Sequence, residues 1–415
     1  MKAFFQFAAL HSLLMGLLPF FIPVLLWQQD YQLSELSFFI ALSGLGFILT
    51  LPLLQKLEQH SRWSTIFAMS FLLEIVLVAG ILWLPTLIIA TSSASLILVA
   101  LINGAYLCFY WMSQRTLFTR LPSTDSGNYS DNKSGNNYGN FQLVVMVLLK
   151  VGILISAFLL DQGLELILFT LTIGISLLAW WILKPAIVSL QEVSLQEVSL
   201  QDERGSSASV KKITLDKPTR SVFFLDGIFL YLESYFWLLS LYLIAQQDVM
   251  QLGILVIGLT ALLAALFWLL KTRIDTLPAN LLFQLAIIGY GFSWLLRAIL
   301  VNDVNNIDGS DYPLILLIAF LTSFFRLSFN KRFFDHSHQY NDKPRQVIQY
   351  LLHKSYLSQW GIVIFFSLQG LLLWFFSSTI DSQFGWVYGL AAPCVFLYGF
   401  YAQPFSHFNK VDHHA

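Results

Sequence analysis

The chain has 415 residues, of which 57 % are hydrophobic and 11 % are charged. Water-soluble globular domains carry about 25 % charged residues, so this composition excludes that class and indicates a protein that resides in a lipid bilayer. A membrane-spanning helix needs about 20 apolar residues, and the apolar content suffices for about twelve such helices. The formal net charge of −1 provides no basic surface, so we expect no nucleic-acid partner.

Apolar runs of spanning length occur along the chain in two sets of six. The first set covers 5–27, 35–54, 65–84, 94–113, 141–160 and 164–183, and the second covers 221–245, 249–270, 279–301, 312–329, 355–376 and 384–404. This pattern predicts an all-α polytopic membrane protein of about 12 transmembrane helices. We expect an N-terminal six-helix bundle over 1–183, a linker over 184–220, a C-terminal six-helix bundle over 221–404 and a tail over 405–415.

The positions of the Lys and Arg residues predict the orientation of these helices. When the N-terminus is placed on the cytoplasmic side, the loops that contain Lys or Arg all fall on that side, and the outer loops carry acidic charges instead. Cytoplasmic loops of membrane proteins are enriched in Lys and Arg. We therefore expect a multi-pass protein of a bacterial-type inner membrane, with both termini and the linker in the cytoplasm.

The linker contains a five-residue tandem repeat. Val-Ser-Leu-Gln-Glu occurs at 188–192 and 193–197, and Val-Ser-Leu-Gln-Asp follows at 198–202. A five-residue period drifts by about 140° per repeat around a helix, so it keeps no constant face. We interpret the repeat as part of a solvated linker that tolerates insertion, with a docking motif as the alternative.

Two cytoplasmic loops carry acidic residues in matching places. The segment Leu54–Trp63, after the second run, contains Glu58 and Arg62, and the segment Lys271–Asp275, after the eighth run, ends in Asp275. With two sets of six spans and a charged linker, this pattern resembles the major facilitator superfamily of secondary transporters. In that family the first loop reads Gly-x-x-x-Asp-Arg-x-Gly-Arg-Arg, and this chain lacks both glycines, as a divergent member does. The resemblance makes Glu58, Arg62 and Asp275 candidate gating-loop residues.

The resemblance also implies which helices surround a substrate. In that family the first, second, fourth and fifth helices of each half line a central cavity, and one half rocks against the other around a site near the midplane. Pro19 and Pro23 in the first run predict a bend in that helix, which membranes tolerate where helices line cavities.

Lys150 and Glu233 lie at similar depths in the membrane. At 1.5 Å per residue, Lys150 is about 15 Å and Glu233 about 18 Å from the cytoplasmic end of its run. An ionised side chain near the bilayer centre costs at least about 2.5–3.5 kcal/mol on insertion scales, so each needs a partner or a function. Because the resemblance places both on the cavity, we hypothesise that they neutralise each other across it or bind opposite ends of a substrate. A permanent ion pair that joins the halves is the alternative.

Further titratable residues are candidates for carrying protons. Asp226 precedes Glu233 by seven residues, which places both carboxylates on one face of a helix, and Trp237 continues that face. Such a row is a candidate proton path, with plain hydration of Asp226 as the alternative. His11 is the one histidine within a run, and an unperturbed histidine changes charge near neutral pH. We consider it a proton relay or a hydrogen-bonded structural residue.

Two polar stripes are expected to face the cavity. The fourth run presents Asn103, Tyr106 and Tyr110 at helical spacing, and the tenth run presents Arg326. Arg326 is a candidate for binding an anionic group through paired hydrogen bonds, with an arginine that extends to the membrane interface as the alternative. Lys354, at the start of the eleventh run, is a candidate for the inner end of the cavity.

Two ionisable residues fall in runs that the resemblance places outside the cavity. Arg297 is expected to extend outward to the membrane interface. Glu74 has no role that the sequence explains.

These residues favour a secondary active transporter that moves a small solute by alternating access and is coupled to protons through Glu233 and Asp226. The cations Lys150 and Arg326 favour a substrate with an anionic group. We expect a monomer in the lipid bilayer, without enzyme activity, cofactor or metal ion. The alternatives are a transport-inactive sensor or scaffold, and a polytopic enzyme that acts on a lipid-linked substrate through the candidate segment Asp335–His338.

Overall fold

The computed structural model of the chain describes residues 2–60, 62–87, 92–120, 131–203, 215–275, 278–301, 311–338, 344–376 and 380–402. The regular elements in these ranges are helices, and eleven helical segments are long and apolar enough to cross a membrane. Each predicted apolar run overlaps either one helix or consecutive helical segments that together form one span. The predicted all-α class with about twelve membrane helices is therefore confirmed.

The N-terminal half begins with a span that is broken at a proline. α1 (Lys2–Leu17) ends before the 3-10 turn Pro19–Phe21, and α2 (Ile22–Gln28) completes the span. Proline lacks an N–H donor and clashes with the preceding turn of a helix, so the break confirms the predicted bend. The later helices are α3 (Leu33–Gln59), α4 (Trp63–Leu87), α5 (Ser92–Arg120), α6 (Asp131–Asp161) and α7 (Glu165–Glu203).

The C-terminal half begins with a span that is interrupted differently. α8 (Lys217–Tyr231) and α9 (Trp237–Ile244) are joined by a π-helical turn, Leu232–Phe236. The later helices are α10 (Val249–Asp275), α11 (Ala279–Val301), α12 (Tyr312–His338), α13 (Pro344–Phe375) and α14 (Ile380–Cys394), followed by the 3-10 helix Val395–Ala402.

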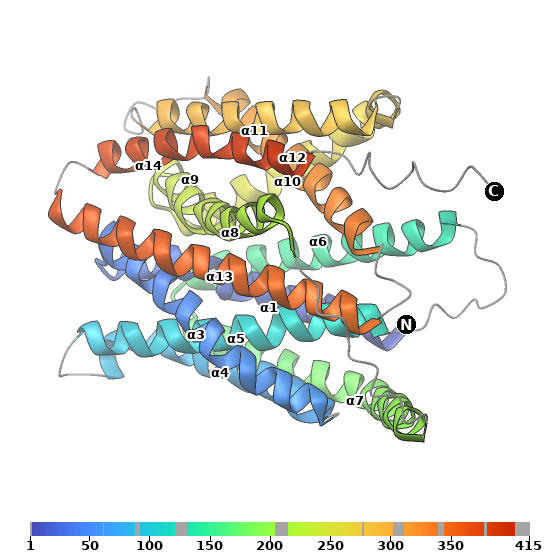
Figure 1. Cartoon of the computed structure of the whole chain (residues 1–415). Coiled ribbons are helices and arrows are strands. Elements are labelled where there is room, and N and C mark those ends of the chain that lie inside the picture. Colours follow the sequence, from blue (N-terminus) through green and yellow to red (C-terminus); the bar gives the residue numbers. More distant parts are fainter. Residues whose placement is uncertain are drawn as a thin grey trace, which may run out of the picture.

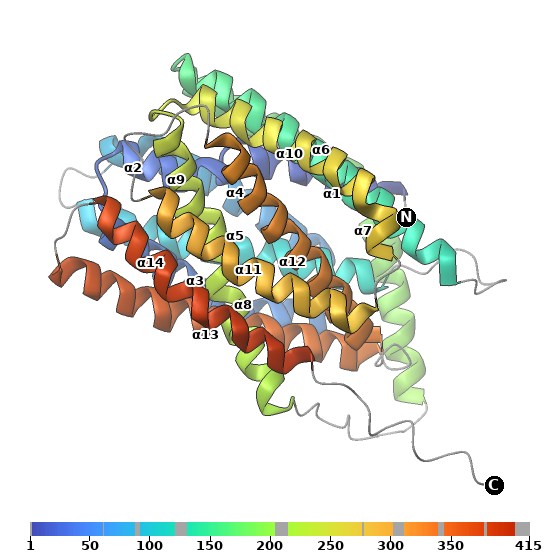
Figure 2. The same ribbon diagram turned by 90° about the horizontal axis from the view of Figure 1, so that it is seen from above.

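The two halves form two bundles that lie side by side (Figure 1). The helices of the N-terminal half, coloured blue to green, lie mostly below those of the C-terminal half, and α13 runs along the boundary. Seen from above, α6 and α10 run together at one edge of the molecule (Figure 2). The bundles are joined by the packing of α3 against α13 and of α6 against α10.

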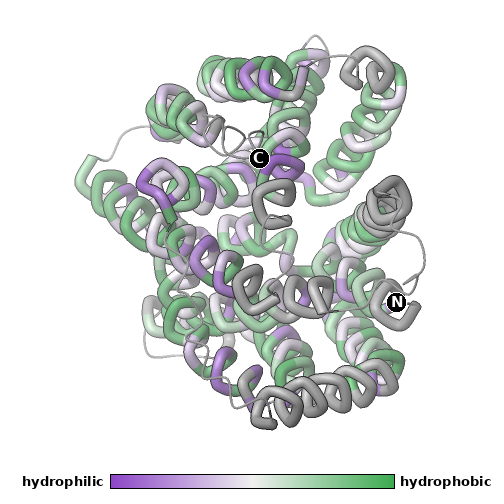
Figure 3. Tube along the Cα trace, turned by 45° about the vertical axis from the view of Figure 1, so that its right-hand side comes forward, coloured by the Kyte–Doolittle hydropathy of each residue, from purple (hydrophilic) through white to green (hydrophobic). Residues whose placement is uncertain are grey.

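Apolar side chains cover the outside of the bundles as well as filling their interior. Hydrophobic residues dominate the helices in Figure 3. Large apolar side chains such as Trp181, Trp268 and Trp374 are exposed, whereas Glu74 and Arg297 are buried. In a bilayer the exposed apolar side chains contact lipid, and the ionisable groups are removed from it.

Glycines allow close helix crossings at equivalent places in the two bundles. α1 and α6 meet at Gly16 and Gly152, where a Cβ atom on either residue would meet the backbone of the other helix. α8 and α13 meet in the same way at Gly227 and Gly361. Small residues permit the close backbone approach that holds helices together in membranes. The first and fifth spans of each half are therefore packed directly against each other.

The sixth span is longer than the sequence predicts. α7 continues to Glu203, whereas the predicted run ends at residue 183. Residues 186–203 contain neither Gly nor Pro, so nothing in the tandem repeat ends the helix. The first part of the predicted linker is helical, and residues 204–214 lie outside the described ranges.

The crossing of α3 and α5 generates a test of the packing. A Cβ atom at Gly104 would meet the Ser43 carbonyl oxygen and the Phe47 backbone nitrogen, whereas a Cβ atom at Gly174 on α7 meets nothing within 4 Å. We expect Gly104→Ala to lower the Tm of the full-length protein in detergent, because overpacking costs about 1–3 kcal/mol. The control Gly174→Ala should leave the Tm unchanged or raise it, because alanine favours helix. Equal Tm values for the two variants would contradict the packing.

Candidate functional site

Arg326 on α12 binds two carboxylates of the span formed by α8, the π-helical turn and α9. Its Nη1 donates to Asp226 Oδ1 at 2.7 Å, and its Nε donates to Glu233 Oε2 at 2.9 Å. Lys354 on α13 places its Nζ 3.2 Å from Asp226 Oδ2. We call these four residues the ion network. Two cations and two carboxylates balance each other, which removes the main cost of burying them.

Two tyrosines complete the coordination of the carboxylates. Tyr290 on α11 donates to Glu233 Oε1, and Tyr398 in the last 3-10 helix donates to Asp226 Oδ1 at 3.4 Å. The Tyr290 ring stacks on Phe325 with the ring centroids 4.1 Å apart. Each carboxylate is thus held by a cation and a phenol from different helices, which fixes the relative positions of the spans that carry them.

Glu233 lies in the π-helical turn Leu232–Phe236. A π-helical turn departs from the regular hydrogen-bond ladder, and such turns occur frequently at functional sites. No residue of this turn is Gly or Pro, so its sequence does not signal the irregularity. The turn directs Glu233 towards Arg326 and Tyr235 towards the other bundle.

The ion network is not sealed from its surroundings. The side chains of Arg326, Asp226, Glu233 and Lys354 are 18 %, 11 %, 15 % and 10 % exposed. The Nη2 atom of Arg326 is buried and has no hydrogen-bond partner. A buried donor of this kind is normally satisfied, so Nη2 is available to an acceptor that enters the site.

The position of Arg297 contradicts the prediction made for it. The expected outward extension is wrong, because the residue is 1 % exposed and lies within the C-terminal bundle. Its guanidinium lies 4.3 Å from the ring centroid of Trp294 and 4.9 Å from that of Trp237. It donates to Ser293 at 3.1 Å and to Thr322 at 2.6 Å. The aromatic faces and hydroxyls replace the water that an interfacial arginine would contact.

The structure also contradicts the hypothesis that Lys150 neutralises Glu233. Both carboxylate oxygens of Glu233 are engaged by Arg326 and Tyr290, and among the described residues no ion pair joins it to Lys150. Lys150 lies half-buried on α6, two residues before Gly152. Counting residues gives the depth of a side chain but not its lateral neighbours, so equal depth did not identify the partner.

The stripe on α5 divides between two environments. Asn103 donates to Ser43 at 3.0 Å and to Tyr235 of the C-terminal bundle at 3.4 Å. Tyr106 and Tyr110 instead lie inside the N-terminal bundle, where both approach His11. Asn103 is therefore the member of the stripe that contacts the opposite half.

Two further hydrogen bonds join the bundles, and the sequence did not single out Gln28, Tyr242 or Met112, which take part in them. Gln28 on α2 donates to the Tyr242 hydroxyl on α9 at 2.9 Å. Ser355, next to Lys354 on α13, donates to the Met112 sulfur on α5 at 3.3 Å. The predicted topology places the first contact at the outer end of the bundles and the second towards the cytoplasmic end. Polar residues with no charge and no periodic pattern give no sequence signal for such contacts.

The candidate gating residues lie apart from the ion network. Glu58 is half-buried in the last turn of α3, and Arg62 is exposed just before α4. Asp275 is the last residue of α10, and its side chain lies outside the described positions, as do the side chains of Asp335–His338. The gating role of these loops stays a prediction.

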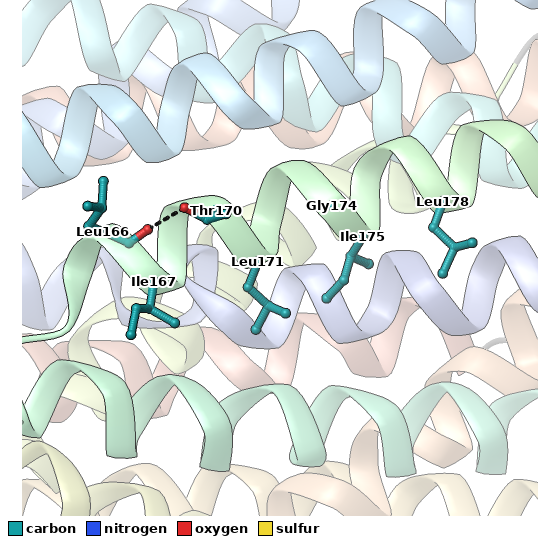
Figure 4. Close-up of a pocket in the computed structure, with 7 residues that line it drawn as sticks. All are labelled: Leu166, Ile167, Thr170, Leu171, Gly174, Ile175 and Leu178. Atoms are coloured by element: carbon teal, nitrogen blue, oxygen red, sulfur yellow. Dashed lines mark hydrogen bonds between the residues drawn. The ribbon is translucent and has the colours of Figure 1, made fainter.

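A groove of about 480 Å³ on α7 is a different kind of feature (Figure 4). Its seven lining residues are Leu166, Ile167, Thr170, Leu171, Gly174, Ile175 and Leu178. The one polar side chain among them, Thr170, donates to the Leu166 carbonyl oxygen at 2.8 Å. The groove therefore offers an apolar surface suited to lipid and no group that would orient a polar solute.

Comparison with known proteins identifies the fold. No protein-family model and no curated protein matches the sequence. Among solved structures the chain is similar to the nucleoside transporter NupG, with 14 % identity, a TM-score of 0.62 and coverage of 97 % of this chain and 98 % of that chain. It is also similar to a D-xylose-proton symporter (12 % identity, TM-score 0.61, coverage 96 % and 97 %). The xylose transporter XylE from E. coli, in a partially occluded inward-open conformation, matches at 12 % identity with a TM-score of 0.58 and coverage of 97 % and 99 %.

Within the described ranges, the helices and these likenesses define a multi-pass membrane protein whose spans form two bundles. Its fold is the one that these solved transporters share, as the resemblance of the sequence to the major facilitator superfamily predicted.

The Asp226–Lys354 pair generates a test of the ion network. Asp226→Asn leaves the Lys354 ammonium without its carboxylate, and Lys354→Gln leaves the Asp226 carboxylate with one cation fewer. Each variant should therefore lower the Tm of the full-length protein. The double variant keeps charge balance, and we expect it to be more stable than the sum of the single losses predicts, by about 0.5–3 kcal/mol. Thermal unfolding of all four proteins in the same detergent measures this coupling. Strictly additive losses would contradict the pairing.

Proposed function

We propose that the protein is a secondary active transporter that moves a small solute across the membrane by alternating access. The observation that carries the proposal is the partly exposed ion network in the C-terminal bundle, with the unpartnered Nη2 of Arg326. Ionisable groups inside a membrane protein mark solute or ion pathways more often than purely structural sites. The fold is shared with solved transporters, which supports the same conclusion.

Alternating access needs bundles that move as units and contacts that exchange. Within each bundle the glycine crossings pack the first span tightly against the fifth. Between the bundles, the Gln28–Tyr242 and Ser355–Met112 hydrogen bonds lie near opposite ends in the predicted topology. Breaking one contact while the other holds would expose the site to one side of the membrane at a time.

The charge count supports a substrate with an anionic group. The described interior of the C-terminal bundle contains the cations Arg297, Arg326 and Lys354 but only the carboxylates Asp226 and Glu233. An anionic group on the solute would balance the additional cation and accept a hydrogen bond from Arg326 Nη2. Lys150 on α6 is a candidate for the opposite end of the solute.

Proton coupling follows from competition for Arg326. If the anionic group of a solute binds Arg326, Glu233 or Asp226 loses its cation and becomes an isolated carboxylate in a site of low polarity. Binding a proton relieves that cost, so solute and proton would move together. The solved D-xylose-proton symporter of the same fold provides a precedent for such coupling.

Uptake into proteoliposomes tests the proposal. The panel should contain radiolabelled uridine, D-xylose and a set of small carboxylates, each with and without an inward proton gradient. We expect uptake of an anionic member, accelerated by the gradient. Uptake of the uncharged members alone would reject the anionic substrate, and uptake of none would reject transport of these classes.

Variants of Arg326 test whether the ion network binds the solute. We expect Arg326→Ala to reduce uptake more than tenfold, because it removes the solute contact and leaves two carboxylates without their shared cation. Arg326→Lys cannot reproduce both hydrogen bonds and should also be impaired. The control Arg220→Ala, at an exposed position on α8, should transport normally. Normal uptake by Arg326→Ala would show that the ion network does not bind the solute.

A further inference from the structure

A second group of ionisable side chains lies inside the N-terminal bundle, on helices that do not contribute to the ion network. His11 on α1 and Glu74 on α4 have side-chain exposures of 0 %, in contrast to the partly exposed ion network. His11 Nε2 lies 3.6 Å from Glu74 Oε2. Tyr106 on α5 donates to Glu74 Oε1 at 3.2 Å, and its hydroxyl lies 3.4 Å from His11 Nε2. At 1.5 Å per residue, His11 and Glu74 are about 14 and 16 Å from the starts of their helices, so they meet deep in the membrane.

The neighbouring helices supply no permanent cation to this pair. In the described part of the chain, Lys150 on α6 and Lys184 on α7 form no ion pair with Glu74. The other titratable groups that face the pair are the phenols of Tyr106 and Tyr110, and the Tyr110 ring centroid lies 3.9 Å from that of His11. Glu58 lies in the last turn of α3. Among the described residues, His11 is therefore the one basic group placed to balance Glu74.

The hydrogen bonds indicate where a proton resides. The Nδ1 atom of His11 is buried without a hydrogen-bond partner. A charged imidazolium would leave a buried N–H donor unsatisfied at Nδ1, and the 3.6 Å approach to Glu74 is too long to compensate for it. A neutral histidine whose proton is on Nε2 places no N–H donor at Nδ1, and protonation of Glu74 at Oε2, which accepts no hydrogen bond, removes the buried charge. The fully buried His11–Glu74 pair therefore needs one proton, held on Glu74, because an ionised carboxylate there would be buried without compensation.

The pair is connected to the contact between the bundles through α5. Asn103 lies one helical turn from Tyr106, and Asn103 donates to Tyr235 in the π-helical turn of the opposite bundle at 3.4 Å. The same π-helical turn contains Glu233 of the ion network. A change in the position of Tyr106 on loss of the Glu74 proton would act through α5 on this contact.

We propose that His11 and Glu74 form a second proton-binding site, which must be protonated before the bundles close over it. One proton from water binds the Glu74 carboxylate, and the pair changes from a net charge of −1 to zero. When the site opens to water, hydration compensates the carboxylate and the proton leaves. The role in closure rests on the proposed transport function, whereas the binding of the proton does not.

Infrared spectroscopy of the full-length protein in lipid tests the proton itself. We expect the carbonyl band of a protonated carboxylic acid in the wild type, retained in Glu233→Gln and absent in Glu74→Gln. The matched control Ser70→Ala changes a buried side chain one turn from Glu74 on α4 and should retain the band. A band of unchanged size in Glu74→Gln would overturn the proposal, provided that gel filtration and Tm show a folded variant.

Solute exchange across the proteoliposome membrane tests the role of the proton in closure. With a solute from the uptake panel and equal pH on both sides, we expect wild-type exchange to fall on the alkaline side by at least tenfold per pH unit, because Glu74 alone contributes the slope of one proton. Glu74→Gln, which mimics the protonated state, should fall less steeply by that slope, and Ser70→Ala should keep the wild-type slope. An unchanged alkaline fall in Glu74→Gln would reject the role in closure. A wild-type protein that exchanges no solute would reject the transport function, while the infrared band would still decide the proton site.

Discussion

The arrangement of this protein depends on the bond between Arg326 and the two carboxylates of the span that contains α8. Ionised groups are costly in hydrocarbon, so each of these side chains requires its partners in order to remain inside the membrane. Arg326 comes from α12, Lys354 from α13, and the phenols from α11 and the last 3-10 helix. The network therefore links four spans of the C-terminal bundle to the span that contains α8. The network keeps its four charged side chains away from the lipid-facing surface.

The two bundles manage buried charge in different ways. The C-terminal bundle uses permanent cations to balance its carboxylates, and the network remains partly exposed. The N-terminal bundle seals Glu74 with His11 and Tyr106, and its charge balance depends on a proton. The partly exposed ion network can exchange its partners when a polar solute enters. The sealed His11–Glu74 pair can gain or lose its proton only when the bundle opens to water. The crossing of the first and fifth spans is equivalent in the two bundles, whereas the polar side chains inside them differ.

The sequence predicts the helices better than their contacts. Apolar run length and the sorting of Lys and Arg gave twelve spans, and Pro19 gave the break in the first. The seven-residue spacing of Asp226 and Glu233 correctly placed both carboxylates on one face, where Arg326 binds both. Periodicity gives depth and face within one helix, but it does not give the rotation of that helix or its neighbours. For this reason Lys150 was assigned the wrong partner and Arg297 the wrong direction, and the π-helical turn could not be foreseen.

The π-helical turn connects the two sites. Glu233 and Tyr235 belong to the same turn, and one binds Arg326 while the other contacts Asn103 across the bundle boundary. Gly227 on α8 and Gly361 on α13 allow these two helices to pack closely, which holds the helix before the turn against α13. The turn, Tyr235 and its hydrogen bond to Asn103 form a connected route from Glu233 to α5, which carries Tyr106. Solute binding in one bundle and proton binding in the other would in this way act on the same contact, and two-state movement of that contact is sufficient to couple them.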